Sequence, residues 1–145
     1  MTFSMVAAAQ IPEDPKARKV APEDVPNVIV SNFNSKGINI LPSWTDNGDT
    51  YMAFYRDTLN RGHIVTYGKN GNLMSLQDEL GPTAYPAAIE RYHDQRFPKE
   101  KFIVWLSTDA SGNKMYYFTR QQETIWFDPL GTVVERSENK KVKQP

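Results

Sequence analysis

Apolar residues recur with helical spacing in two segments of the chain, and each segment opens on a proline. Pro86 suits the first position of a helix because its missing N–H is not needed there, and apolar side chains follow at i, i+3, i+4 and i+7. These side chains are Tyr85, Ala88, Ile89 and Tyr92. The first segment, from Pro26 to Gly37, shows a weaker form of the pattern and contains β-branched residues. We therefore expect two helices, the first of which depends on packing rather than on propensity.

Four short runs of strand-forming residues follow each helical segment, and turn residues separate them. In the first half the runs lie near residues 38–45, 51–57, 63–67 and 73–77. In the second half they lie near residues 102–108, 114–120, 123–128 and 132–136. Asn47-Gly48 and Asn70-Gly71 indicate tight hairpins, because Asn and Gly accept the positive φ that such turns require.

The two halves of the chain match each other in sequence. A shift of 60 residues superposes Pro26 on Pro86, Ile29 on Ile89, Tyr67 on Phe127 and Gly71 on Gly131, and a shift of 61 superposes Trp44 on Trp105. We therefore predict an α+β fold: a tandem repeat of a helix plus a four-stranded antiparallel meander, forming one sheet with both helices on one face. The first repeat would span about residues 25–78 and the second about residues 85–136.

The two ends of the chain differ from the segment between them. Residues 1–9 combine a short apolar run with an Ala-x-Ala triplet, which predicts the end of a signal peptide, cleavage near Gln10 and export. The basic region that opens such a signal is missing, so we expect that an upstream start was lost; the competing interpretation is an ordinary apolar N-terminus. Residues 10–24 are rich in proline and charge and predict a flexible leader. Residues 137–145 predict a polar tail.

Composition narrows the class of protein. A chain of 145 residues with 39% hydrophobic and 23% charged residues is typical of one globular domain. Seventeen basic residues balance seventeen acidic residues, so no global field attracts nucleic acid or an anionic membrane. The absence of cysteine excludes thiol nucleophiles, disulfides and Cys-ligated zinc. No later segment approaches the roughly 20 apolar residues of a membrane span.

The sequence offers little catalytic or metal-binding chemistry. His63 and His93 lack partners at the spacing of a metal site. The Asp46-Asn47-Gly48-Asp49 stretch lacks the alternating ligands and distal glutamate of a calcium loop, and a hairpin turn explains it. Four carboxylates could serve in acid/base catalysis, but their spacing does not single out a pair. They are Glu90, Asp94, Glu100 and Asp109. We therefore predict no catalytic residues, no metal and no cofactor.

The aromatic residues are the informative feature of the sequence. The runs 51–55 and 115–118 place large residues on both faces of a strand, because side chains alternate along it, whereas helices cover one face only. Ile125 and Phe127 are expected to face the core, which turns Trp126 outward. The sequence does not decide which face of the second strand in each half is buried, since a shift of one residue moves every side chain to the other face. The candidate partner-binding residues are Trp126, Tyr51, Tyr55 and Tyr117. Loops or a dimer mate that covers this face are the competing explanation.

Four short stretches carry a resemblance to a known family. They are Trp44…Asn47-Gly48-Asp49-x-Tyr51, Tyr67…Asn70-Gly71-Asn72-Leu73, Tyr85-Pro86-Ala87-Ala88-Ile89 and Trp126-Phe127-Asp128…Gly131. Over about residues 25–136 the chain resembles the PepSY-like domains related in fold to the β-lactamase inhibitor proteins, which are common in envelope proteins of Bacteroidetes. One departure is that the family's Phe-Asp-x-x-Gly turn reads Tyr67-Gly68-Lys69-Asn70-Gly71 in the first half. The resemblance implies secretion, a tandem repeat and non-catalytic binding of a protein or peptide.

These observations together predict a non-catalytic periplasmic or secreted binding module. It would dock onto or inhibit another envelope or secreted protein, or a peptide, through an aromatic sheet face. We expect a monomer or weak dimer that binds no nucleic acid and has no membrane span. The alternatives are a sensory module that binds a small ligand, peptide or metal and, in third place, a weak hydrolase.

Overall fold

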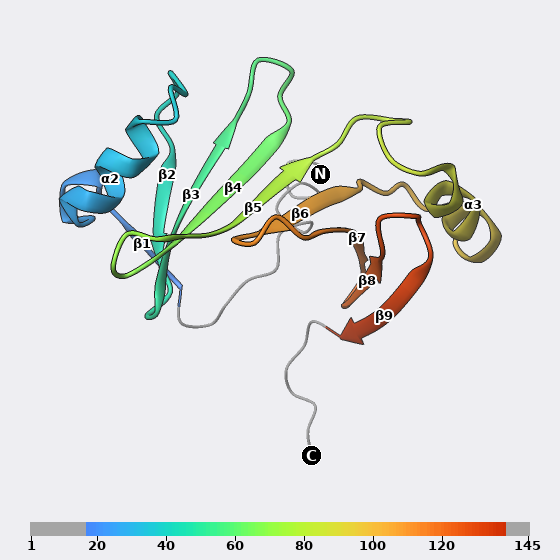
Figure 1. Ribbon diagram of the computed structural model, residues 1–145. Helices are drawn as coiled ribbons and strands as arrows, with labels where there is room; N and C mark the ends of the chain where they lie inside the picture. The colour runs from blue at the N-terminus through green and yellow to red at the C-terminus, as the bar shows by residue number, and fades with distance from the viewer. Residues whose placement is uncertain (1–16, 139–145) are drawn as a thin grey trace. The chain divides into compact units, whose positions relative to one another are not determined.

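The computed structural model describes residues 17–138, so the expected signal-peptide remnant lies outside the described residues, as do residues 10–16 of the expected leader and 139–145 of the expected tail. The described residues form nine strands, two α-helices and one 3₁₀-helix. The strands follow one another in the sheet in chain order, from β1 to β9. Figure 1 labels the strands and the two α-helices along the chain.

The chain divides into two compact units, which we describe separately. Within the described residues, the N-terminal unit comprises residues 17–78 and 108–113, and the C-terminal unit comprises residues 79–107 and 114–138. Each unit contains one α-helix and its own cluster of buried apolar residues.

The N-terminal unit holds β1 (Arg18–Val20), the 3₁₀-helix Pro22–Asp24, α2 (Asn27–Asn34), β2 (Ser43–Asp46), β3 (Thr50–Arg56), β4 (Gly62–Gly68) and β5 (Leu73–Glu79), whose last residue belongs to the other unit. All neighbouring strands here, from β1 to β5, pair antiparallel. Helix α2 begins directly after Pro26, which occupies the N-cap and not the first helical position that the sequence suggested for the prolines. It buries Ile29 and Phe33, so packing holds a helix that is poor in strong helix formers.

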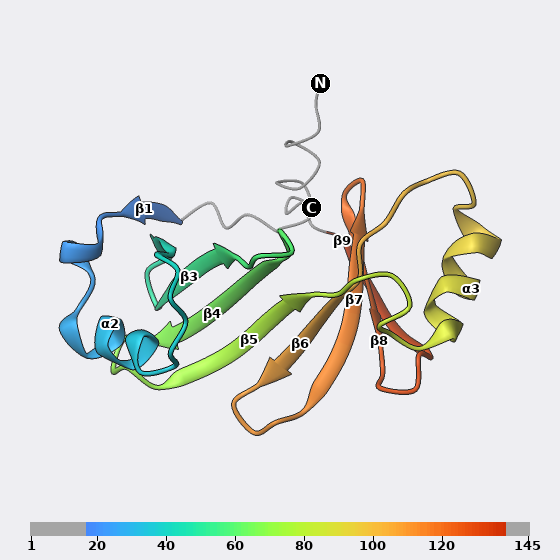
Figure 2. The same ribbon diagram turned by 90° about the horizontal axis from the view of Figure 1, so that it is seen from above.

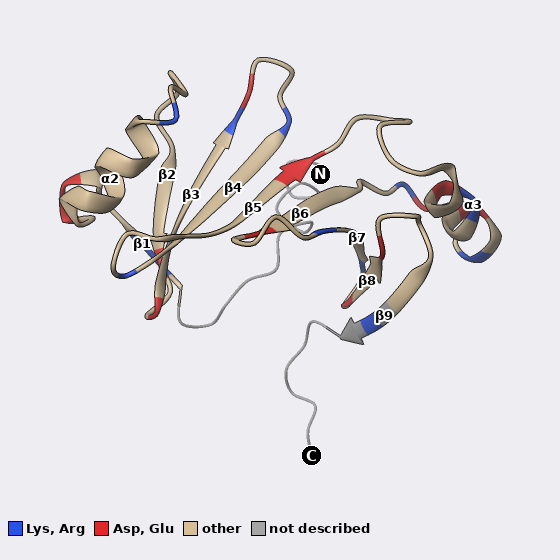
Figure 3. Cartoon of the chain, viewed as in Figure 1, with Lys and Arg blue, Asp and Glu red and all other residues tan. Residues whose placement is uncertain are grey.

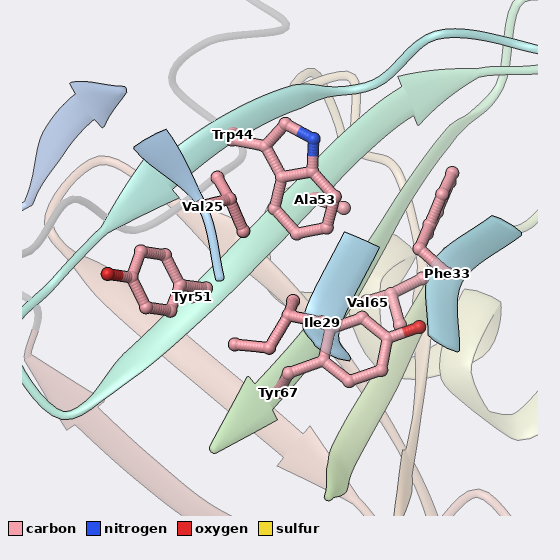
Figure 4. Packing of buried hydrophobic residues seen from close by; sticks show 8 residues of the cluster. All are labelled: Val25, Ile29, Phe33, Trp44, Tyr51, Ala53, Val65 and Tyr67. Carbon is pink, nitrogen blue, oxygen red and sulfur yellow. The ribbon is translucent and has the colours of Figure 1, made fainter. Parts of the chain in front are cut away.

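The core of this unit lies between α2 and one face of β2, β3 and β4. Trp44, Ala53 and Val65 are register partners on the three strands and therefore share that face. Phe33 of α2 meets the Trp44 ring edge-on, with ring centroids 5.7 Å apart. Figure 4 shows the buried cluster, whose members are Val25, Ile29, Phe33, Trp44, Tyr51, Ala53, Val65 and Tyr67.

The C-terminal unit holds α3 (Ala87–Arg96), β6 (Trp105–Asp109), β7 (Lys114–Arg120), β8 (Glu123–Phe127) and β9 (Val133–Glu138). The last two residues of β6 belong to the other unit. Helix α3 begins after Pro86 and ends before Phe97. It lies against β7 and β8 (Figure 2), because Ile89 of the helix is buried in one cluster with strand residues. The buried members are Ile89, Val104, Phe118, Ile125 and Phe127.

Four of the hairpins use one turn geometry. In each, the first residue donates its N–H to the carbonyl of the fifth, and the fourth donates to the carbonyl of the first. These turns begin at Asp57, Gly68, Asp109 and Asp128. In the three that begin with aspartate, the carboxylate also accepts the N–H groups of the third and fifth residues. The motif Asp-x-x-Gly or Asp-x-x-Asn thus has a mechanism, because the aspartate closes the turn with its own side chain.

The expected fold class is wrong. We predicted an α+β tandem repeat of a helix plus a four-stranded meander with both helices on one face, whereas the structure is dominated by a nine-stranded sheet with two short helices. Each helix buries only two of its residues. The helical spacing of apolar residues reveals that a helix exists but not how little it adds to the core. Strand β1 lay outside the predicted pattern altogether.

Strand β1 forms inside the range expected to be a flexible leader. Its three residues pair with β2, and Val20 packs against the N-terminal core. A guanidinium nitrogen of Arg18 lies 2.8 Å from a carboxylate oxygen of Asp46. The N–H of Gly48 first, and then Lys69 and Arg18, hold the pKa of Asp46 below its ordinary value. Backbone pairing and an ion pair with the buried Asp46 leave no apolar pattern, which is why composition alone misses this strand.

Candidate partner-binding face

Three aromatic rings form a row across β6, β7 and β8 in the C-terminal unit. Tyr117 and Trp126 are register partners, with ring centroids 4.5 Å apart. The Trp105 ring stacks on the other side of Tyr117 at 6.4 Å and an interplanar angle of 15°. The neighbouring residues Phe118 and Ile125 belong to the core against α3. Because side chains alternate along a strand, the aromatic row lies on the face turned away from α3.

The three rings differ in exposure. Trp105 and Tyr117 are each 2% exposed, whereas Trp126 is half-buried and keeps part of its surface accessible. Burial raises the pKa of Tyr117, so its hydroxyl stays protonated at any physiological pH. The indole N–H of Trp105 has no hydrogen-bond partner within the described residues. The row therefore consists of two fixed rings that position the third.

The structure separates the four predicted partner-binding residues into two pairs. Tyr117 and Trp126 lie together in the aromatic row, as described above. Tyr51 is buried in the N-terminal core (Figure 4). Tyr55 packs against that core, and the centroids of its ring and the Phe33 ring are 5.9 Å apart. Both tyrosines of β3 thus face α2, which resolves the register that the sequence left open.

Sequence reasoning missed Trp105. The match between the two halves superposes it on Trp44, which is a core residue beneath α2. In the C-terminal unit the core position belongs to the preceding residue, Val104, and Trp105 joins the opposite face. The available signal was Val104-Trp105 itself, an apolar pair at the start of a strand in which one of the two must face away from the helix.

The two histidines have different surroundings. The Nε2 of His63 lies 2.8 Å from Asp57 Oδ2, and its Nδ1 lies 2.7 Å from Asp78 Oδ1. His93 of α3 is 2% exposed, stacks on Phe102 with ring centroids 3.8 Å apart, and has no partner for Nε2 within the described residues. Both ring nitrogens of His63 are therefore engaged, and His93 is enclosed by aromatic rings.

Two of the four candidate carboxylates, Glu100 and Asp109, have structural roles. Glu100 forms a bidentate pair with the guanidinium of Arg120, at 2.8 and 2.7 Å. That pair holds the pKa of Glu100 below its ordinary value, and the Arg120 guanidinium also lies 3.9 Å from the centre of the Phe97 ring. Asp109 closes the β6–β7 turn. Within residues 17–138, no three His, Asp or Glu side chains are grouped so as to hold a metal ion.

The comparison with known proteins gives structural neighbours only. No family model matches the sequence, and no curated protein is similar to it at a significant level. The fold is shared with Bacteroides proteins. One, from Bacteroides eggerthii, is provisionally described as periplasmic; it superposes with a TM-score of 0.68 and 14% identity over 79% of this chain and 88% of its own.

Two further solved structures show the same similarity. A DUF2874 family protein from Bacteroides uniformis superposes with a TM-score of 0.66 and 11% identity, over 81% of this chain and 92% of its own. A BLIP-like protein from Bacteroides fragilis superposes with a TM-score of 0.58 and 14% identity, over 83% of this chain and 92% of its own. At these identities the similarity concerns the fold. It agrees with the β-lactamase-inhibitor side of the resemblance and does not extend to PepSY domains specifically.

None of the helices within residues 17–138 combines the length and apolar character needed to cross a membrane.

Proposed function

We propose that this chain is a non-catalytic binding module of the bacterial envelope that docks onto, or inhibits, another envelope protein. Trp126 would be its principal contact. The proposal includes a periplasmic location, which the provisionally periplasmic and BLIP-like structural neighbours support. His63, Glu100 and Asp109 make structural hydrogen bonds, and His93 is packed among aromatic rings, which favours binding over catalysis.

The observation that carries the proposal is the aromatic row. Tryptophan and tyrosine are enriched at interface hot spots because they offer a large, stiff contact area with a polar group at one end. Trp126 is held against Tyr117, which is itself held against Trp105. A side chain that is already fixed before binding loses little conformational entropy when a partner covers it. Trp126 therefore has the properties of a preorganised anchor.

The test compares two aromatic truncations on opposite faces of the same strand pair. Trp126→Ala removes the accessible ring, whereas Tyr116→Ala removes a half-buried ring on the α3 side. Wild-type protein and both variants would be immobilised and exposed to solubilised envelope proteins of the source organism. We expect Trp126→Ala to weaken retention of a specific partner at least about tenfold, since truncating an interface tryptophan commonly costs ~2 kcal/mol or more.

The melting temperature of each variant provides the control for folding. Trp126→Ala should melt near the wild type, whereas Tyr116→Ala should melt earlier and still retain the partner per folded molecule. Equal retention by wild type and Trp126→Ala would contradict the proposal. A Trp126→Ala variant that unfolds early but binds normally would show that the ring serves the fold and that the binding face lies elsewhere.

A further inference from the structure

His63 joins three strands at one end of the N-terminal unit. It lies near the start of β4, with Tyr55 of β3 as its register partner on one side and Asp78 of β5 on the other. Its ring contacts Asp57, which opens the β3–β4 turn, and Asp78, near the end of β5. Figure 3 shows acidic residues at both places. A single side chain thus links all three strands at this end, in addition to the strand pairing and the core packing.

The geometry requires a protonated ring. Each ring nitrogen lies within 2.8 Å of a carboxylate oxygen, and an ionised carboxylate can only accept hydrogen bonds. A neutral imidazole carries one N–H, so its other nitrogen would direct a lone pair at a negatively charged oxygen. The imidazolium form donates to both carboxylates. Tyr55 also favours the cation, since its ring stacks on the imidazole with centroids 4.8 Å apart.

The two carboxylates are not held equally. Asp57 also accepts the N–H groups of Leu59 and Arg61, at 2.9 and 3.0 Å, so its turn is closed without His63. Within the described residues, the side chain of Asp78 has His63 as its one hydrogen-bond partner. If the ring loses a proton, one hydrogen bond must be lost. We expect the bond to Asp78 to be the one that breaks.

We infer that His63 is a pH-sensitive clamp that fastens the end of β5 to β4 while it is protonated and releases Asp78 when it loses a proton. This device is independent of the partner-binding face proposed above, because all of its residues belong to the N-terminal unit. It gives the protein a local structural response to the acidity of its surroundings.

The charges around His63 favour its protonated form. Burial lowers the pKa of His63, but the hydrogen bonds with Asp57 and Asp78 outweigh burial and raise the pKa above its ordinary value of 6.5. The hydrogen bond from His63 is the chief cause that lowers the pKa of Asp57 to about 2. Burial raises the pKa of Tyr55, as do the charges of the two carboxylates, so this ring stays neutral.

Three further charged residues lie on the elements that pack around His63. They are Arg56, Arg61 and Glu79. The Arg56 guanidinium donates to the carbonyl of Asn60 and lies 5.4 Å from the centre of the Phe54 ring. Glu79 is adjacent to Asp78 on β5, so its side chain points to the opposite face of the sheet.

The sign of the pH effect follows from the raised pKa of His63. The folded protein holds the proton more tightly than the unfolded chain does, so the clamp stabilises the fold fully below about pH 6.5. That contribution is lost as the pH rises through the folded pKa. The lowered pKa of Asp57 sets the acidic limit of the clamp. The ionised Asp57 carboxylate contributes to the stability of the fold above about pH 3.8, and this contribution is lost as the pH falls toward 2.

The experiment is an NMR titration of the whole protein between pH 5 and pH 10, with amide exchange measured on the same samples. His63 and His93 are the two histidines of the chain, so their ring signals can be assigned by mutation. We expect the midpoint of His63 to lie above 6.5. The protection of the amides near Asp78, which is the intrinsic exchange rate at each pH divided by the observed rate, should fall at the same midpoint. Asp78→Asn keeps an acceptor but removes the charge, and should lower the midpoint by about one unit, a tenfold change in proton affinity.

Two variants provide controls. Glu79→Gln removes the same charge one residue further along β5 and should leave the midpoint within about 0.2 units of the wild type. His63→Gln should remove the pH dependence of amide protection at the end of β5. The inference is overturned if the wild-type midpoint lies at or below 6.5, or if Asp78→Asn and Glu79→Gln shift it equally. It is also overturned if His63 titrates while the protection of the amides near Asp78 stays constant, since the ion pair would then be a permanent contact.

Discussion

The turn between β4 and β5 and the turn between β8 and β9 have the same backbone but are held by different side chains. Each follows a register shift in the strand pairing, and each places a glycine with positive φ against a helix. In the β8–β9 turn Asp128 accepts two backbone N–H groups. In the β4–β5 turn Gly68 occupies the aspartate position, and Asn70 Oδ1 accepts the N–H of Asn72 at 3.1 Å. Asn32 of α2 also donates to the carbonyl of Gly71, at 2.8 Å.

This difference shows which part of the motif the fold requires. The aspartate can be replaced, because Asn70 within the turn accepts one of the N–H groups and Asn32 ties the turn to α2 from outside. The glycine is constrained in both turns, since a side chain there would meet α2 in one unit and α3 in the other. The glycine therefore serves the packing of helix against turn, and the aspartate serves the turn itself.

The largest effect is expected for Gly131→Ala. A Cβ at this position would lie 2.9 Å from Pro86 Cβ and 3.1 Å from Ala88 Cβ, and neither atom can turn away because each is attached directly to the backbone of α3. The φ of +93° adds backbone strain. Overpacking and strain together should cost about 3 kcal/mol or more of unfolding free energy. Chemical denaturation measures it, and a loss below ~1 kcal/mol would show that α3 can move.

A smaller loss is expected for Gly71→Ala. The φ is almost the same, +94°, but the nearest atoms are the methyl groups of Val28 at 3.1 and 3.3 Å and the amide of Asn32 at 3.3 Å. Val28 is 48% exposed and can change rotamer. Backbone strain then dominates, so we expect about 2 kcal/mol in the same measurement. A loss equal to that of Gly131→Ala would mean that the two helices are equally rigid at these contacts.

Removal of the aspartate should cost less than either glycine substitution. Asp128→Ala leaves the N–H groups of Leu130 and Thr132 without their acceptor, but both bonds are exposed and water replaces them. We expect a loss of about 1 kcal/mol, comparable to the loss of a helix cap. Asp128→Asn retains an acceptor and should recover most of the stability. If it does not, the charge rather than the hydrogen bond stabilises the turn.

The smallest effect is expected for Gly68→Asp, which places in the β4–β5 turn the aspartate found in the other three. Its backbone φ is not positive, and the new Cβ would meet only Asn70 Oδ1 at 3.3 Å and the side chain of Met74 at 3.5 Å. Both neighbours can adjust. We expect the melting temperature to stay the same or to rise by an amount equivalent to ~0.5 kcal/mol. A clear destabilisation would show that Asn32 and Asn70 already hold this turn in a form that excludes the carboxylate.

The sequence predicted the local elements better than it predicted the fold class. Helices α2 and α3 begin after the two prolines, and β7 occupies the expected range 114–120. These signals are local, because they depend on spacing and on turn residues. The error arose where the outcome depends on how much each element buries, which the pattern of apolar residues does not measure. Strand β1 was missed for a related reason, since backbone hydrogen bonds between distant segments hold it.

Half of the candidate face followed from the sequence. The sequence predicted that Ile125 and Phe127 face the core, and the structure places these two residues in the core. Trp126, which lies between them on β8, therefore points to the face away from α3. No such reference existed for β3, where Tyr51, Ala53 and Tyr55 alternate with Met52 and Phe54, and both sets are apolar. When both sets are apolar, periodicity cannot decide which faces the helix, and the register with α2 decides it.

The unequal exposure of the tryptophans makes the protein its own spectroscopic probe. Of the three tryptophans in the chain, Trp44 and Trp105 are buried and Trp126 is partly accessible. A collisional quencher such as acrylamide therefore reaches mainly the fluorescence of Trp126, and the light from the other two indoles forms a protected background. A ligand that covers the aromatic row would remove the quenchable fraction and shift the emission to shorter wavelength. Binding can thus be followed in unlabelled protein, before the identity of the partner is known.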